Sequence, residues 1–215
     1  MGQLLWEQDS IERGKITADF YTMLHREPSA KRFTGTVFEP PFHDLCVRGT
    51  TFTLYPMTKR TEGSSSYIFV NYPPATLETL VLLPQTRVVF NRKSPVTRLL
   101  ANYYYQPTTG NQPSYDAFIY EPIFRLLTSI QVTEGEFHGL KPKGIYGLRD
   151  LAQRLGINGL KLRVVIVVPE DYHQVECPVE KVMYDNLGFE MYYIEVIESE
   201  LYENCGNVNV SQTVM

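Results

Sequence analysis

Residues 114–133 of this chain read Ser-Tyr-Asp-Ala-Phe-Ile-Tyr-Glu-Pro-Ile-Phe-Arg-Leu-Leu-Thr-Ser-Ile-Gln-Val-Thr. They contain one apolar run before Glu-Pro-Ile and another after it, a pattern typical of two strands joined by a turn. Gln131 and Thr133 are two residues apart and therefore share a face of the second strand. If the two strands form one hairpin, Asp116 on the first strand can converge with them. The alternative for Asp116 is a strand carboxylate that faces solvent, and for Gln131 and Thr133 a cross-strand polar pair.

The residues after this stretch predict a crossover to a parallel strand. Residues 145–155 place their leucines on one helical stripe, and Gly156 ends that pattern. Leu162–Val168 is a continuous, mainly β-branched run, which is typical of a strand covered on both faces. A strand, a helix and a strand over residues 124–168 form a crossover unit, which favours a sheet with parallel character. We therefore predict an α/β fold with a mixed central sheet flanked by helices.

Weaker signals predict the remaining elements. A helix is expected over residues 9–26. A second is expected over 35–49, ending at Gly49 and interrupted by Pro40 and Pro41. Strands are expected at residues 51–56, 67–70, 79–83, 87–90, 115–120, 124–133 and 190–196. A loop is expected at residues 106–114.

Composition excludes several classes of protein. With 43% hydrophobic and 20% charged residues among 215, the chain has an ordinary globular composition. No apolar stretch reaches the roughly 18 residues that a membrane span requires, and the N-terminus lacks the pattern of a signal peptide. Three cysteines (Cys46, Cys177 and Cys205) form no CxxC pair, which disfavours structural zinc and disulfides and fits a reducing compartment. We expect a soluble intracellular chain with no membrane partner.

Charge is unevenly distributed along the chain. The total is −4, but residues 86–163 carry eleven Lys and Arg against five Asp and Glu, whereas residues 169–203 carry one Lys against ten acids. The basic segment contains Asp116 and Gln131. Contact with phosphates needs a local basic surface rather than a basic total, so this segment is a candidate nucleic-acid surface. The alternative is a solvated surface whose charges are unevenly placed.

Several short motifs occur in a fixed order along the chain: Gly35-x-x-Phe-Glu39 with His43, Gly49-x-x-Phe52-x-Leu54, Tyr115-Asp116-Ala-Phe, Gln131-x-Thr133 with His138, and Leu162–Pro169. In order and spacing they resemble the restriction-endonuclease-like domain, of the PD-(D/E)xK superfamily, that Crinkler effectors share with the retrotransposon hot spot proteins of trypanosomes. The resemblance implies a restriction-endonuclease-like α/β core.

The resemblance also implies a division of the chain. We expect residues 1–215 to form a single domain, with an N-terminal helical extension at 1–34, a nuclease-like core at 35–170, and an acidic C-terminal strand and tail at 171–215. Effector-type members act inside other cells, often in the nucleus, so a nuclear destination is implied. The chain lacks the N-terminal delivery region of a full-length Crinkler, so we expect an excised domain or a stand-alone relative.

By the same resemblance, we expect the chain to hydrolyse DNA with a Mg²⁺ or Mn²⁺ ion. Asp116 would be the principal metal ligand, Glu39 its helix-borne acidic partner, and Gln131 a ligand through its neutral carbonyl oxygen, which a hard cation accepts. Thr133 and His138 complete the implied catalytic set. Contacts to nucleic-acid phosphates would come from Lys141, Lys143 and Arg149.

Two departures from the family pattern bear on activity. Thr133 stands where a lysine is usual, and a hydroxyl supplies no positive charge to the transition state; Lys141, Lys143 or His138 would have to supply it. Pro40 and Pro41 interrupt the helix that carries Glu39. A second hypothesis is therefore a catalytically inactive module of the same fold that binds nucleic acid or a host protein. A third is a small-molecule enzyme on an unrelated α/β fold, although the chain has no Gly-rich phosphate loop and no Ser-His-Asp signature.

Overall fold

The computed structural model describes residues 31–62, 65–71, 77–108, 114–133, 139–170, 175–197 and 201, with only the backbone for 31–37 and 62. The expected helix at 9–26, His138 and the chain beyond residue 201 lie outside the described residues. The chain divides into two compact units, residues 46–195 and residues 1–45 with 196–215.

The described elements are three helices and eleven strands. The helices are α2 (Lys31–Arg48), α3 (Pro142–Arg154) and α4 (Lys181–Leu187). The strands are β1 (Thr50–Pro56), β2 (Thr58–Glu62), β3 (Ser66–Val70), β4 (Glu78–Leu82), β5 (Thr86–Phe90), β6 (Tyr103–Pro107), β7 (Ala117–Glu121), β8 (Leu126–Val132), β9 (Lys161–Pro169), β10 (Glu176–Glu180) and β11 (Glu190–Val196).

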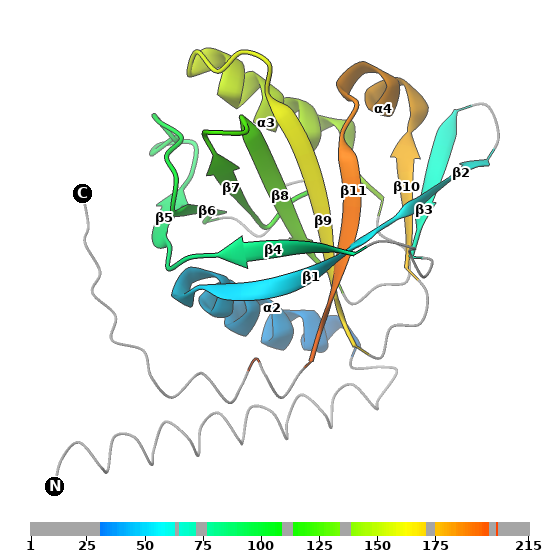
Figure 1. Ribbon diagram of the computed structural model, residues 1–215, viewed down its shortest axis with the longest axis horizontal. Helices are drawn as coiled ribbons and strands as arrows, with labels where there is room; N and C mark the ends of the chain where they lie inside the picture. Colours follow the sequence, from blue (N-terminus) through cyan, green and yellow to red (C-terminus); the bar gives the residue numbers. More distant parts are fainter. Residues whose placement is uncertain are drawn as a thin grey trace, which may run out of the picture. The chain divides into compact units, whose positions relative to one another are not determined.

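The main sheet is mixed and eight-stranded, with the order β4-β1-β11-β9-β8-β7-β6-β5, and a three-stranded sheet has the order β10-β3-β2 (Figure 1). In the large sheet β8–β9 and β5–β6 are parallel, whereas β7–β8 and β1–β4 are antiparallel. The predicted α/β class with a mixed sheet is therefore confirmed. None of the helices in the described part of the chain is long and apolar enough to cross a membrane.

The large sheet is strongly curled. Its two end strands, β4 and β5, are joined by only three residues, 83–85. Such a connection spans at most about 14 Å, whereas the outer strands of a flat eight-stranded sheet would lie about 34 Å apart. The short connection is therefore compatible only with a sheet that brings its ends toward each other.

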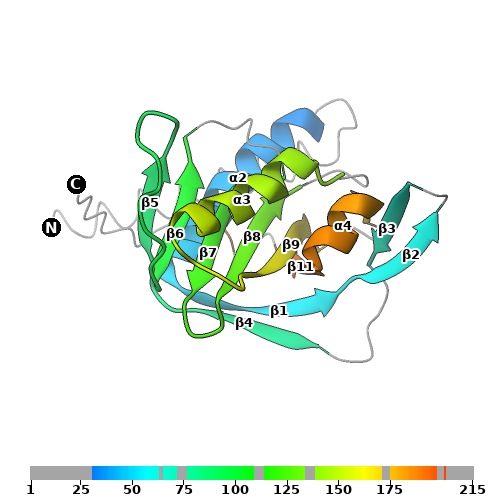
Figure 2. The ribbon, with the colours of Figure 1, turned by 90° about the horizontal axis from the view of Figure 1, so that it is seen from above.

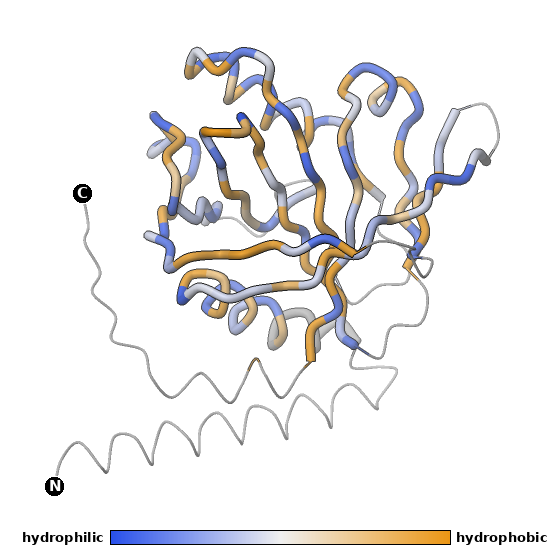
Figure 3. The backbone as a smooth tube through the Cα atoms, in the orientation of Figure 1, coloured by the Kyte–Doolittle hydropathy of each residue, from blue (hydrophilic) through white to orange (hydrophobic). Residues whose placement is uncertain are grey.

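The hairpin and the crossover predicted from the sequence are both present. Ala117 pairs with Ile130 in the antiparallel β7–β8 ladder, and Leu126 pairs with Lys161 in the parallel β8–β9 ladder. Helix α3 lies over one face of the sheet (Figure 2). Its buried stripe packs into one apolar cluster with strand residues that include Leu127, Val164 and Ile166. The hydrophobic colouring of β9 in Figure 3 reflects its burial on both faces.

Four elements were not predicted: β2, β6, β10 and α4. The loop expected over 106–114 was wrong at its start, because β6 continues to Pro107. The three missed strands, β2, β6 and β10, are only five residues long, and β2 consists of polar residues. They therefore lack the alternation of apolar and polar residues by which a strand is predicted. Pro178 in β10 is tolerated because β10 is at the edge of its sheet.

The interruption predicted in the second helix was also wrong. Helix α2 continues through Pro40 and Pro41 and ends at Arg48. Phe38, Phe42, Leu45 and Cys46 follow a helical spacing and are buried, and such burial can outweigh the backbone hydrogen bonds that the prolines remove.

The predicted end of that helix at Gly49 is confirmed. Gly49 has φ +92°, and a Cβ atom there would lie 2.8 Å from the backbone nitrogen of Pro84 and 2.9 Å from the carbonyl oxygen of Leu82. Only glycine combines this backbone conformation with this close approach.

Candidate functional site

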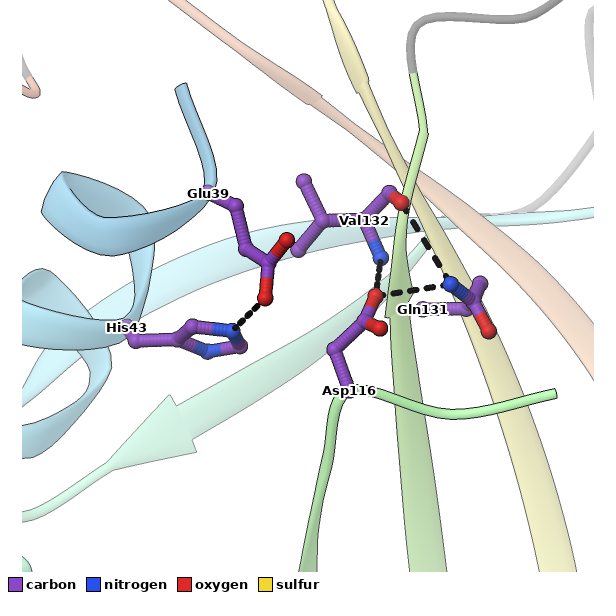
Figure 4. A network of polar contacts seen from close by, with 5 residues as sticks. All are labelled: Glu39, His43, Asp116, Gln131 and Val132. Carbon is purple, nitrogen blue, oxygen red and sulfur yellow. Dashed lines mark hydrogen bonds and ion pairs between the residues drawn. The ribbon is translucent and has the colours of Figure 1, made fainter. Parts of the chain in front are cut away.

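Asp116 closes the open end of the β7–β8 hairpin. Its backbone N–H donates to the carbonyl oxygen of Ile130 at 2.8 Å. Its carboxylate oxygen Oδ2 accepts two further hydrogen bonds, from the Nε2 of Gln131 at 2.7 Å and from the backbone N–H of Val132 at 2.8 Å (Figure 4). The hairpin therefore brings Asp116 and Gln131 together, and the carboxylate serves as an acceptor at the strand end.

The side-chain amide of Gln131 has one orientation compatible with this contact. An ionised carboxylate can only accept hydrogen bonds, so the amide nitrogen must face Asp116. The carbonyl oxygen Oε1 then points elsewhere, is buried, and has no hydrogen-bond partner among the described residues. Since Gln131 is only 7% exposed, this oxygen is a desolvated acceptor, which costs about 1–3 kcal/mol unless a water or a cation satisfies it.

Thr133 follows Gln131 at the end of β8. Its backbone N–H donates to the carbonyl oxygen of Val167 at 2.9 Å, which extends the parallel ladder with β9 by one step. Its side chain is buried. Ser129, two residues before Gln131, is buried as well and donates through Oγ to the carbonyl oxygen of Arg163 at 3.3 Å. Neutral polar side chains thus alternate along this end of β8.

Ser114 connects the Asp116 segment to helix α3, and sequence reasoning missed it. Its Oγ donates to the carbonyl oxygen of Lys141 at 3.0 Å and accepts from the backbone N–H of Lys141 at 2.5 Å. Ser114 is buried and has φ +75°. A serine in a loop rich in Gly, Pro and Asn gives no signal of such a contact. Because Ser114 is two residues before Asp116, these hydrogen bonds hold the start of α3 close to the Asp116 segment.

The predicted phosphate-contacting residues lie along α3. Lys141 is the residue before the first turn, Lys143 is in that turn, and both side chains are exposed. Arg149 lies eight residues beyond Lys141, which is about 12 Å along a helix axis. Its guanidinium lies 4.8 Å from the ring centre of Tyr146, and its Nε lies 3.6 Å from Oδ1 of Asp150. The helix therefore presents two cations at its start and a third further along.

Glu39 and His43 form a pair of their own. Because α2 is continuous through the prolines, the two residues are one helical turn apart, and the His43 Nε2 lies 3.3 Å from Glu39 Oε1 (Figure 4). His43 is buried, whereas Glu39 is partly exposed. This pair belongs to residues 1–45, a different compact unit from Asp116 and Gln131. The meeting of Glu39 with Asp116 and Gln131 stays a prediction, as does any role of His138, which lies outside the described residues.

A second polar cluster, which the sequence did not suggest, connects three strands of the large sheet. The Nη2 of Arg163 lies 3.4 Å from Glu78 and 3.5 Å from Glu190, and its guanidinium stacks over Tyr192 at 5.0 Å. The Tyr192 hydroxyl donates to Glu78 Oε1 at 2.5 Å. Burial, with the Glu78 carboxylate next, raises the pKa of Tyr192 well above its ordinary value. These residues come from β4, β9 and β11, so their proximity depends on the strand order.

Comparisons with known proteins give no relative on which to rest a function. No family model matches the chain, and neither a curated protein nor a solved structure matches it significantly. Across the residues that the structure describes, no group of three or more His, Cys, Asp or Glu side chains could hold a metal ion. A functional proposal for this chain therefore depends on the α/β fold and on the Asp116–Gln131 pair at the end of the hairpin.

Proposed function

We propose that this chain is a metal-dependent endonuclease-like domain that hydrolyses phosphodiester bonds in DNA, with Asp116 and Gln131 at its centre. The observation that carries the proposal is the buried carbonyl oxygen of Gln131, which has no hydrogen-bond partner among the described residues and belongs to a side chain that also contacts Asp116. A buried acceptor of this kind is normally satisfied by a water, an ion or another polar group. A hard cation is a suitable ligand, because it accepts neutral carbonyl oxygens as well as carboxylates.

The donor set fits Mg²⁺ or Mn²⁺ in chemical type. Asp116 would contribute its carboxylate, Gln131 its amide oxygen, and Glu39 a second carboxylate, as the family resemblance implies. When bound, such a cation would acidify the attacking water and stabilise the charge of the phosphate. Gln131 would also hold Asp116 in place, because its amide nitrogen fixes one of the two carboxylate oxygens.

The residues of α3 would position the substrate. Lys141 and Lys143 are exposed at the start of the helix, where backbone N–H groups add partial positive charge. Ser114 holds this start next to the Asp116 segment through two hydrogen bonds. The two lysines would attract phosphates to the site and supply the positive charge that Thr133 cannot provide. Arg149 would contact the backbone of the nucleic acid further along.

The arrangement of elements also supports the proposal. A hairpin, a helix and a strand parallel to the second hairpin strand follow one another in β7, β8, α3 and β9. Asp116 and Gln131 lie at the same end of adjacent strands, as the resemblance to restriction-endonuclease-like domains implies.

A second candidate is an inactive module of the same fold that binds nucleic acid or a host protein. The observation in its favour is that Asp116 Oδ2 already accepts two protein hydrogen bonds. These bonds make the carboxylate a structural cap of the hairpin, which needs no cation. With Thr133 in place of lysine, the exposed lysines of α3 would then act only in binding.

The two candidates separate in a plasmid-nicking assay with Mg²⁺ or Mn²⁺. We expect the native chain to nick supercoiled DNA, Asp116→Asn to lose that activity, and Asp185→Asn to keep it. Asp185 is a suitable control because it is an exposed carboxylate on α4 and contacts none of the proposed site residues. Equal cleavage by the native chain and Asp116→Asn would overturn catalysis at this site.

If the native chain does not cleave, a salt titration of DNA binding tests the binding module. Affinity that falls with salt, and falls further in Lys141→Glu/Lys143→Glu, would support nucleic-acid binding. Absence of binding even at low ionic strength would contradict it and leave a protein as the ligand.

A further inference from the structure

Strand β4 ends the eight-stranded sheet with an apolar outer surface. Leu80 and Leu82 point inward and are buried, whereas Val81 is 60% exposed and is flanked by the exposed Leu77 and Leu83. The hydrophobic colouring along this strand is visible in Figure 3. Among the described strands, β4 pairs on one side only, with β1. The strand therefore combines an unpaired backbone edge with exposed leucine and valine side chains.

The two edges of the three-stranded sheet carry features that oppose pairing. The three-stranded sheet ends in β2, where Lys59 and Arg60 are exposed. Its other end, β10, contains Pro178 and is bridged through Val179 by Leu140. Charged residues, prolines and covering segments are the usual means by which proteins prevent strands from associating at an edge.

Edge β4 has little such protection. Its one charged residue, Glu78, is exposed but is engaged by Arg163 and by the Tyr192 hydroxyl. The neighbouring outward side chains on β1 are Thr51 and Thr53, which are uncharged and lie opposite Val81 and Thr79. A strand that approaches this edge would meet threonine, valine and leucine side chains and no unpaired charge.

The sequence of this edge is complementary to itself. In an antiparallel pair centred on Leu80, Leu77 of one copy faces Leu83 of the other, and Thr79 faces Val81. Thr79 and Val81 lie on one face of β4, and Leu77 and Leu83 are the residues immediately before and after the strand. Glu78 faces Leu82, so no like charges oppose each other.

We propose that two copies of this chain associate through β4, in an antiparallel pair about a two-fold axis at Leu80, so that the two large sheets become continuous. A two-fold contact uses the same patch on both copies and closes after two chains. The unpaired edge and the self-complementary order of its exposed residues support this assignment. The proposal stands independently of the nuclease activity.

Sedimentation velocity over a range of concentrations tests the association. We expect the native chain to show a concentration-dependent monomer–dimer equilibrium, and Val81→Lys to weaken the dimer at least tenfold, because it places two lysines at the contact. Val182→Lys should leave the equilibrium unchanged. It is a matched control, since Val182 is also 60% exposed but lies on α4. A native chain that stays monomeric at every concentration, or equal weakening by both variants, would overturn the proposal.

Disulfide formation tests the register. The chain has three cysteines, of which Cys46 and Cys177 are buried and therefore protected from oxidation. The experiment removes the third thiol with Cys205→Ser. Thr79→Cys and Val81→Cys chains are mixed under oxidising conditions. Because the two positions face each other across the proposed pair, the mixture should form a mixed disulfide dimer at least tenfold faster than either variant alone. Equal rates in the mixture and in the separate variants would contradict pairing about Leu80.

Discussion

The Nε2 of Gln131 donates a 2.7 Å hydrogen bond to Oδ2 of Asp116, while the Oε1 of the same amide is buried without a hydrogen-bond partner among the described residues. One side chain therefore fixes the carboxylate through its nitrogen and leaves its own carbonyl oxygen, which points elsewhere, as a desolvated acceptor. If a cation binds there, substitutions at Gln131 should change how the stability of the chain depends on that cation.

Gln131→Glu places a second carboxylate against Asp116. Without metal, repulsion between the two groups and the loss of the donated hydrogen bond should lower the free energy of unfolding by at least about 1.5 kcal/mol. Millimolar Mg²⁺ should restore most of that loss. The measurement is thermal unfolding with and without MgCl₂.

Gln131→Leu is the control for this substitution. It removes the hydrogen bond and the amide oxygen together, so it should lower stability by about 1.5 kcal/mol without recovery in Mg²⁺. The same Mg²⁺ response in the Glu and Leu variants would show that the cation acts elsewhere on the chain.

Two glycine substitutions should change stability in opposite directions. Gly49→Ala should cost about 2 kcal/mol or more, because φ is +92° and the new Cβ would lie 2.8 Å from the backbone of Pro84. Gly147→Ala should stabilise by about 0.5–1 kcal/mol, because it lies within α3 and its Cβ would meet nothing within 4 Å. Urea unfolding of both variants measures the effect. A stable Gly49→Ala chain would rule out the described connection between α2 and β1.

Two arginines on the described surface should differ in their contribution to stability. Arg163 is 14% exposed and lies between Glu78 and Glu190, so Arg163→Ala should cost about 2 kcal/mol through lost charge pairing and lost packing on Tyr192. Arg149 is 37% exposed and pairs with Asp150, so Arg149→Ala should cost less than about 0.5 kcal/mol. In a DNA-binding assay we expect the reverse order, with the larger loss for Arg149→Ala. Chemical denaturation gives the first comparison, and equal destabilisation by the two variants would contradict it.

Stability should fall as the pH rises above 9. Burial raises the pKa of the Cys46 thiol from 9.0 to about 12, although the Tyr104 hydrogen bond and the Arg87 charge partly oppose the shift, and burial raises that of Cys177 to about 12. The unfolded thiols therefore lose their protons from about pH 9, while the folded thiols keep theirs until about pH 12. Each thiol should lower the free energy of unfolding by about 1.4 kcal/mol per pH unit in this window.

Cys177→Ala isolates the contribution of one thiol. The variant should show a shallower decline of stability with pH than the native chain, by the slope of one titrating group, whatever its stability at neutral pH. Denaturant unfolding at several pH values between 8 and 11 measures both slopes. Identical slopes would mean that Cys177 titrates alike in the folded and unfolded chain.

The sequence alone predicted the elements whose apolar pattern is long and regular. Strands β9 and β11, helix α3 and the β7–β8 hairpin were located within a few residues, and the parallel β8–β9 pairing followed from the crossover. These predictions succeeded because periodic burial is encoded locally, in the spacing of leucines or in a run of valines. Short strands such as β6 have no such pattern and were missed.

The candidate site was predictable only in part, for the same reason. The sequence indicated that Asp116 and Gln131 can converge if the two apolar runs form a hairpin, because adjacent strands fix which residues oppose each other. It gave no indication of the buried Gln131 oxygen or of Ser114 at the start of α3, since both depend on residues that are distant in sequence. The continuity of α2 through Pro40 and Pro41 likewise depends on the burial of Phe38 and Phe42.

Sequence therefore determined the α/β class, the principal elements and the pairing of Asp116 with Gln131, because local periodicity and hairpin geometry need no further information. Tertiary structure alone decided the strand order, which gathers Glu78, Arg163 and Tyr192 and leaves β4 at the edge of the sheet. Strand order is set by which apolar faces can be buried together, and that is a property of the whole chain rather than of any one segment.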